Sequence, residues 1–257
     1  MVSMKTDSRL KPHISQAIRH WPSCYCVLAT IVVALVWHSN IKAEEQGSSS
    51  QYEIIPYLWV ASFSGTTAAD GNESPPIDSD YNFFSLDNLD GVASATFTAR
   101  GQQWGFLFDF LYVAYEDTFF EGKLTETTAT LEGLILEFAG TYKPKSFKSL
   151  DIVAGLRRQD IDVEVAIFNR NSQAAVDWVD PFVGVIYSHF FTNNFLLSLR
   201  GDLGGFGIES DSAVNAEAMF RYQFNKTVST ELGYRYLKVK FEDSNFVYDV
   251  SLDGFLL

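Results

Sequence analysis

FLLSLRGDLGGF, from Phe195 to Phe206, is the stretch that decides the fold. Successive side chains of a β-strand point to opposite faces, so Leu197, Leu199 and Leu203 fall on one face of this stretch. Ser198, Arg200 and Asp202 fall on the other face. A soluble barrel keeps apolar side chains inside, whereas a transmembrane barrel turns its apolar face outward, to lipid, and its polar face inward. The pattern favours the transmembrane barrel.

The same alternation recurs along most of the chain. One face of the segment 104–115 carries five aromatic side chains, and Asp109 lies on the other. Similar two-sided patterns occur in 131–142, 212–223 and 228–236. Short alternating strands are therefore expected throughout, with tyrosines near strand ends forming an interfacial girdle.

The pattern predicts an all-β fold, an up-and-down antiparallel transmembrane β-barrel of about ten strands, with eight or twelve left open. The expected strands are 52–62, 91–100, 104–115, 128–142, 150–162, 178–190, 195–208, 212–223, 228–241 and 246–257. Pro56 fits the first strand if its position needs no backbone donor. Short turns should alternate with longer loops, as in outer-membrane barrels.

Basic and acidic residues are distributed differently between the short turns and the longer loops. The expected short turns carry Arg100, Lys143, Lys145, Lys148 and Lys226. The expected loops carry acids, namely Asp70, Glu73, Asp78, Asp80, Glu116, Asp117, Glu121, Glu242 and Asp243. A soluble sandwich gives no reason for this asymmetry.

The N-terminal segment has the layout of a secretory signal peptide. A basic region precedes the apolar run from Cys24 to Trp37, which is shorter than the roughly 20 residues that a membrane-spanning helix needs. We expect cleavage after Ala43, giving a signal peptide over 1–43 and a barrel over 44–257. An uncleaved anchor and a start at Met4 remain alternatives.

Removal of residues 1–43 changes the chemistry that the chain can perform. Both cysteines and three of the four histidines lie in that segment, which excludes disulfides and cysteine-type zinc sites from the remainder. The remainder has 14 Lys and Arg against 31 Asp and Glu, a net charge of −17. Such a chain is not expected to bind nucleic acid, which requires Lys and Arg to neutralise phosphates.

If the charged face looks inward, ten side chains meet in the lumen. Because unpaired buried charges cost several kcal/mol each, we expect them to form a hydrogen-bonded, partly hydrated network. The set is Asp109, Glu137, Arg157, Asp180, Arg200, Asp202, Glu217, Arg221, Glu231 and Arg235. An open sheet with these charges in water stays the alternative, because periodicity does not say which face is enclosed.

Several stretches resemble the recurrent blocks of a proteobacterial outer-membrane β-barrel family whose members are often described as porin-like. They are YLWVASFSG at Tyr57, LDNLDG at Leu86, ARGQQWGFLFDFLYV at Ala99, DIVAGLR at Asp151, WVDPFVGV at Trp178, LRGDLGGFG at Leu199 and ELGYRYLKV at Glu231. The resemblance covers roughly 52–252. It implies the outer membrane of a Gram-negative bacterium, reached by Sec-dependent export, and no defined activity. It also implies contact with outer-membrane lipid, and with periplasmic chaperones and the barrel-assembly machinery during biogenesis.

The C-terminus departs from that family. Such barrels usually end on an aromatic residue, whereas this sequence ends in SLDGFLL. Either a short closing strand or a truncated coding sequence is expected from this ending.

Three functions remain open at this stage. Outer-membrane enzymes generally use His as a general base. The remaining histidine, His189, is expected beside a periplasmic turn, away from a substrate that enters from outside. We therefore expect no enzyme activity, no catalytic residue and no cofactor or metal. A barrel of about ten strands is close to the size that side chains fill, so we expect a structural or narrow porin-like monomer with little conductance. An outer-membrane enzyme and a soluble ligand-binding barrel of the lipocalin type are the alternatives.

Overall fold

The computed structural model describes residues 51–69, 72–73, 89–119, 127–167, 170–225, 228–243 and 246–257. The expected signal peptide, Lys226, and the acids at 70, 78, 80 and 121 lie outside these residues. In the described ranges, no helix has the length and apolarity needed to span a membrane.

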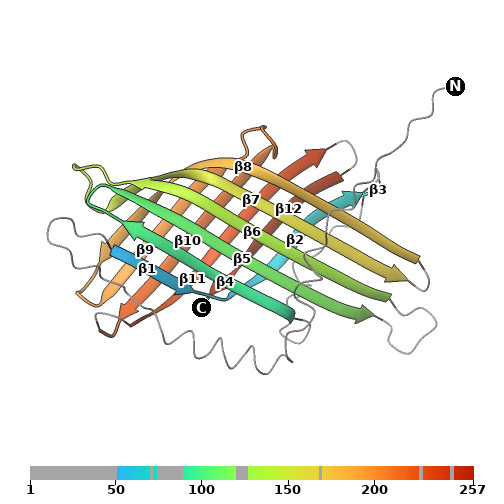
Figure 1. Ribbon diagram of the computed structural model, residues 1–257, viewed down its shortest axis with the longest axis horizontal. Coiled ribbons are helices and arrows are strands. Elements are labelled where there is room, and N and C mark those ends of the chain that lie inside the picture. The colour runs from blue at the N-terminus through green and yellow to red at the C-terminus, as the bar shows by residue number, and fades with distance from the viewer. Residues whose placement is uncertain are drawn as a thin grey trace.

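The described chain forms one antiparallel sheet. Its strands are β1 (Gln51–Pro56), β2 (Trp59–Ala69), β3 (Asn72–Glu73), β4 (Leu89–Arg100), β5 (Trp104–Phe119), β6 (Thr127–Tyr142), β7 (Leu150–Ile167), β8 (Arg170–Phe190), β9 (Phe195–Gly204), β10 (Ser212–Gln223), β11 (Ser229–Asp243) and β12 (Phe246–Leu256). From β4 to β12 each strand pairs with the next in the chain, which is the expected up-and-down order. In Figure 1 strands β4 to β8 cross in front of β9 to β12, so the sheet curls into two facing walls.

The first expected strand is divided between two partners. Its first part, β1, pairs with β4, and its second part, β2, pairs with the last strand, β12. At the link, Leu58 N donates to Leu257 O and Leu257 N donates to Leu58 O, both at 2.9 Å. Pro56, which has no N–H to donate, ends β1 where the chain leaves one partner for the other. The bent first strand thereby brings the two ends of the sheet together.

The last strand is a complete member of the sheet. β12 has 11 residues and pairs along its length with both β11 and β2. The expectation of a short closing strand is therefore wrong for the described chain.

The connections between strands lie at two ends of the sheet, a turn side and a loop side. The turn side carries the connections 101–103, 143–149, 191–194 and 224–228, and the loop side carries those between β5 and β6, β7 and β8, β9 and β10, and β11 and β12. The expected loop after 162 is wrong, because β7 and β8 continue as a paired hairpin as far as Ile167 and Arg170. Paired strands, and not a long loop, therefore extend the β7–β8 hairpin on the loop side.

Strand β9 ends at Gly204 and not at the expected residue 208. Gly205, Phe206 and Gly207 have φ values of 82°, 54° and 69°, in the left-handed region that interrupts an extended strand. Gly205 N donates to Pro181 O at 3.1 Å, so the loop turns back onto β8.

Candidate functional site

The interior of the sheet is crossed by a cluster of buried charges centred on Glu137. The Glu137 carboxylate accepts hydrogen bonds from Arg157 Nε at 2.8 Å, Arg200 Nη2 at 2.7 Å and Arg235 Nη2 at 3.0 Å. Glu137 lies on β6, whereas Arg200 and Arg235 lie on β9 and β11 of the opposite wall. The cluster therefore joins strands that are not neighbours in the sheet.

Asp202 forms a second centre beside Glu137. It accepts hydrogen bonds from Arg157 Nη2 at 2.8 Å, Arg200 Nε at 2.9 Å and Asn215 Nδ2 at 2.8 Å. Asn215 Oδ1 in turn accepts a hydrogen bond from Arg235 Nε at 3.0 Å. Asn215 thus connects the two centres without adding charge.

Asp109 completes the cluster toward the first strand. It accepts hydrogen bonds from Tyr57 Oη at 3.0 Å and Thr96 Oγ1 at 2.6 Å, and its Oδ2 lies 3.5 Å from Arg235 Nη1. We call Asp109, Glu137, Asp202, Arg157, Arg200 and Arg235 the central charge cluster. Three acids face three arginines, so the cluster is electrically balanced.

The equal numbers of acids and arginines matter because the central charge cluster is buried. Glu137 and Arg157 are 0% exposed, and Arg235 and Asp202 are 2% and 3% exposed. A buried ion loses several kcal/mol of hydration, which is offset only when partners satisfy it. The planar guanidinium of arginine suits this role because it donates to two carboxylates at once, as Arg157 and Arg200 do here.

The ten inward charges expected from the sequence fall into separate groups. Asp180 lies opposite Arg157 in the β7–β8 register but forms no ion pair with a described arginine. Its carboxylate accepts hydrogen bonds from Trp178 Nε1 at 3.0 Å, Ser210 N at 3.0 Å and Ser210 Oγ at 2.7 Å. It fixes the β9–β10 loop to β8.

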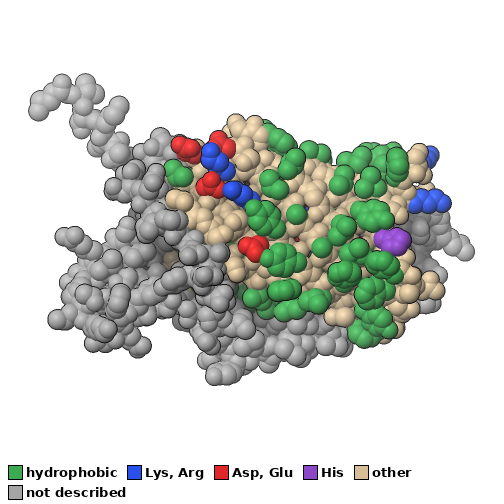
Figure 2. Space-filling view, turned by 180° about the vertical axis from the view of Figure 1, so that it is seen from behind, with side chains coloured by type: hydrophobic (Ala, Val, Ile, Leu, Met, Phe, Trp, Pro, Cys, Tyr) green, Lys and Arg blue, Asp and Glu red, His purple; other side chains and the backbone are tan. Residues whose placement is uncertain are grey.

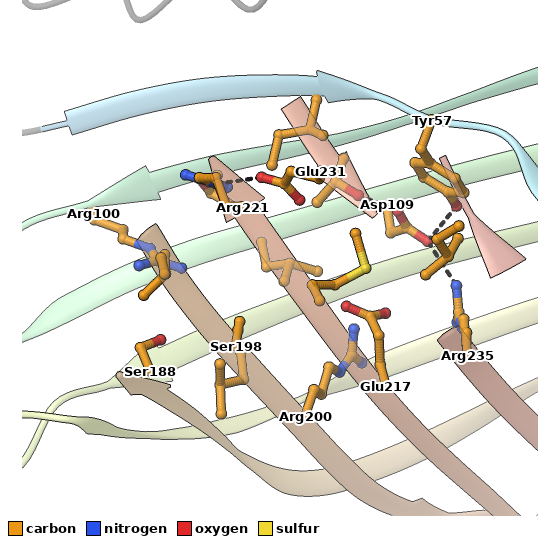
Figure 3. A pocket seen from close by; sticks show the side chains of 18 residues that line it. Tyr57, Arg100, Asp109, Ser188, Ser198, Arg200, Glu217, Arg221, Glu231 and Arg235 are labelled. Carbon is orange, nitrogen blue, oxygen red and sulfur yellow. Dashed lines mark hydrogen bonds and ion pairs between the residues drawn. The ribbon is translucent and has the colours of Figure 1, made fainter. Parts of the chain in front are cut away.

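A second group lies closer to the turn side. Arg221 forms ion pairs with Glu231 and with Glu53, the latter at 2.6 Å. Glu217, the tenth residue, faces the interior but forms no hydrogen bond or ion pair with another described residue; Figure 3 shows it beside Arg200. In place of the expected single network, the structure has a balanced cluster, a triad, a loop clamp and Glu217, which lies near Arg200 and Arg235 without a direct ion pair.

Sequence reasoning did not identify several interior partners. Glu53, Tyr57, Thr96, Asn215 and Ser210 all contact the expected charges. Strand alternation is the signal for three of them: Glu53 and Tyr57 share the parity of inward Trp59, and Asn215 shares that of Glu217. Ser210 lies in a loop, where alternation gives no information.

Apolar side chains fill the loop-side part of the interior. Trp178 is 2% exposed and its ring stacks on Phe241, with centroids 4.8 Å apart, and contacts Tyr248 at 5.6 Å. Leu237, Val239 and Val250 are 1–2% exposed around them. We call these six residues the inner apolar layer. The loop-side part of the interior is therefore mainly apolar, and the ionic cluster lies in the middle.

A cavity of about 130 Å³ lies on the turn side of the central charge cluster (Figure 3). Its walls combine ionic, hydroxyl and aliphatic groups, including Arg100, Glu217, Arg221, Ser188, Ser198 and Met219. Arg100, at the end of β4, is exposed and lies at the turn side. Within the described residues, no group of three His, Cys, Asp or Glu side chains could hold a metal ion.

The outer face carries the expected apolar side chains. Leu199 and Leu203 are 41% and 55% exposed, against 3% for Asp202 between them. Seen from behind, hydrophobic side chains gather on the part of the surface that includes the histidine (Figure 2). Acidic side chains lie toward the other end, and basic side chains lie at both ends.

His189 belongs to this outer face. Its ring lies 6.4 Å from that of Tyr187 and 4.8 Å from that of Phe191, centroid to centroid. It lies near the end of β8 on the turn side, among aromatic rings, and away from the interior carboxylates.

No family model and no curated protein matches the chain. Among solved structures, the chain resembles Ail, the attachment invasion locus protein of Yersinia pestis, in complex with the heparin analogue sucrose octasulfate. The TM-score is 0.37 and the sequence identity is 8%, and the match covers 82% of this chain and 100% of Ail. The chain also resembles the translocator domain of the autotransporter NalP from Neisseria meningitidis (TM-score 0.35, 9% identity, 90% and 93%). Both of those proteins are outer-membrane β-barrels.

Proposed function

We propose that the protein is a monomeric integral barrel of the bacterial outer membrane, with ten strands and a closed interior, and that its role is structural. The ten strands are β4 to β12 and the bent first strand formed by β1 and β2. The turn side faces the periplasm and the loop side faces outward in this proposal.

The observation that carries the proposal is the exposure of apolar side chains outside a charged interior. Phe138, Leu156, Val183 and Phe220 are 47–52% exposed, whereas Glu137 and Arg157 are 0% exposed. Exposure of such an apolar outer surface to water is unfavourable in free energy, whereas contact with lipid stabilises it. A lipocalin-type barrel needs an apolar lumen, but the cavity found here is lined by four arginines and three acids.

The height of the apolar surface supports the same assignment. The outward positions from Val214 to Phe224 on and just after β10 carry no charge. With about 3.4 Å per residue and a tilt of about 45°, this stretch spans about 24 Å, close to the apolar band of outer-membrane barrels. Beyond it on the loop side, charged pairs such as Lys240 and Asp211 are exposed.

Membrane fractionation with heat-modifiable gel mobility tests this proposal. The folded barrel should sediment with outer membranes and migrate differently before and after boiling. Identical mobility of protein recovered from a soluble fraction would contradict it.

The closed interior leads us to propose a structural role over a porin-like one. The central charge cluster blocks the middle of the interior, and the inner apolar layer fills the loop side. Planar-bilayer recording of refolded protein should show no stable conductance steps. Large, regular steps would instead support a pore, which the excess of interior acids would make cation-selective.

An enzymatic role receives no support from the position of His189. We propose that it is an interfacial side chain, because it stacks with aromatic rings on the outer face. Substitution of His189 by Asn should leave folding and gel mobility unchanged.

A further inference from the structure

The connection between β6 and β7, residues 143–149, concentrates positive charge at the turn side. It contains Lys143, Lys145 and Lys148. Lys143 lies 3.5 Å from Asp151, but Lys145 and Lys148 are exposed and form no ion pair with the described residues. We call this connection the basic turn.

Hydrogen bonds hold the basic turn in place. Lys143 N donates to Gln103 O of the β4–β5 turn at 2.7 Å, and Ser188 N of β8 donates to Ser149 O at 2.8 Å. Within the turn, Phe147 N donates to Pro144 O at 3.1 Å. The two free ammonium groups are thus presented from a fixed backbone.

Exposed aromatic rings surround these lysines. Phe147 lies between Lys145 and Lys148 in the chain and is 63% exposed. Trp104 is 71% exposed and contacts Tyr142, which precedes the turn, with ring centroids 4.7 Å apart. At the adjoining end of β8, Phe190 is 66% exposed, and Phe191, the first residue of the β8–β9 connection, is 56% exposed. Aromatic rings beside lysines are typical of the boundary between hydrocarbon and headgroups.

On the loop side, the two exposed lysines of β11 each lie beside an acid. Lys238 lies 3.4 Å from Asp249, and Lys240 lies 3.4 Å from Asp211. Lysines of similar exposure are therefore neutralised on the loop side and unpaired on the basic turn. This difference among the described lysines points to an anionic partner on the turn side.

We propose that the basic turn binds the phosphate of an anionic glycerophospholipid in the leaflet at the turn side. Lys145 and Lys148 contact the phosphate, while Phe147 and Trp104 lie among the upper acyl chains. This inference rests on the proposed membrane location and adds a lipid class and the residues that select it. Snorkelling of the lysine stems would bring both ammonium groups to the headgroup level.

The exposed tryptophan provides a direct assay. In a chain carrying W21F and W37F, Trp104 is the outer tryptophan, since Trp59 and Trp178 are 7% and 2% exposed inside the sheet. Quenching of its fluorescence in vesicles of brominated phosphatidylglycerol mixed with phosphatidylcholine, and in the converse mixture, gives the relative affinity of the two lipids at this site.

We expect the site to prefer phosphatidylglycerol over phosphatidylcholine about tenfold, which corresponds to a binding free energy difference of about 1.4 kcal/mol. This value lies between the contributions of one and of two lysines at an anionic surface. The variant K145Q/K148Q should reduce the preference to near unity, and the matched loop-side control K238Q/K240Q should retain it. No preference in the parent chain, or an unchanged preference in K145Q/K148Q, would overturn the inference. Quenching by neither brominated lipid would instead contradict the membrane location itself, so the two failures are distinguishable.

Discussion

Substitution of Glu137 by Gln removes the charge that three arginines share. The shape of the side chain is kept, but the central charge cluster changes from three acids and three arginines to two acids and three arginines. Glu137 is 0% exposed, so no water replaces the lost charge. Removing one member of a buried ionic cluster costs about 3–5 kcal/mol. We expect E137Q to lower the free energy of unfolding by that amount.

Urea unfolding of the protein refolded in vesicles measures this loss, with tryptophan fluorescence as the signal. The control K240Q breaks an exposed pair, with side chains 45% and 50% exposed, and should cost no more than about 1 kcal/mol. The double variant E137Q/R235Q restores equal numbers of acids and arginines, so it should lose less than the sum of its two single variants. A loss in E137Q as small as that in K240Q would refute the view that the cluster must be balanced.

Three other substitutions test separate parts of the structure. A Cβ at Gly184 would collide with the carbonyl oxygen of Gly201 and lie 2.5 Å from Asp202 Cβ, so G184A should lower the free energy of unfolding by about 1–3 kcal/mol. A Cβ at Gly140 meets nothing within 4 Å, so the control G140A should change it by less than about 0.5 kcal/mol in the same unfolding assay. L199R places a charge on the proposed lipid face and should cost about 2–4 kcal/mol, whereas a neutral effect on heat-modifiable mobility and unfolding would place Leu199 in water. W178A removes the largest side chain of the inner apolar layer and should cost about 3–5 kcal/mol by calorimetry or urea unfolding; a loss below about 1 kcal/mol would show that this layer is not packed.

Strand alternation explains how much of the fold could be predicted from sequence. All ten expected segments correspond to strands, and the inward and outward residues of β9 lie as Leu199 and Asp202 indicate. Alternation continues through Tyr57 and Leu58, however, so it gave no sign that the first strand changes partner there. The apolar residues of GGFG also concealed the end of β9, because backbone conformation and not hydropathy stops that strand.

The interior could be predicted only in part, because alternation fixes a face and not a height along the barrel. Arg221 shares the inward face with Glu137 but lies too far along its strand to join the same cluster. Asp180 lies directly opposite Arg157 in the strand register, yet its carboxylate accepts hydrogen bonds from Trp178 and from Ser210, a loop residue that alternation does not place. Trp178 has the parity of Asp180, so its inward direction followed from the sequence. Its stacking on Phe241 depends on strands that are distant in the chain, and no local pattern reports such a contact.

Accessibility of single spin labels along β9 tests the central claim most directly. In a background carrying C24S and C26S, labels at 197–203 can be compared for collision with oxygen, which dissolves in lipid, and with a water-soluble nickel complex. We predict a period of two, with high oxygen collision at Leu197, Leu199 and Leu203 and low oxygen collision at Ser198 and Asp202. The opposite phase, or equal exposure of all positions to the nickel complex, would contradict a barrel whose apolar face meets lipid.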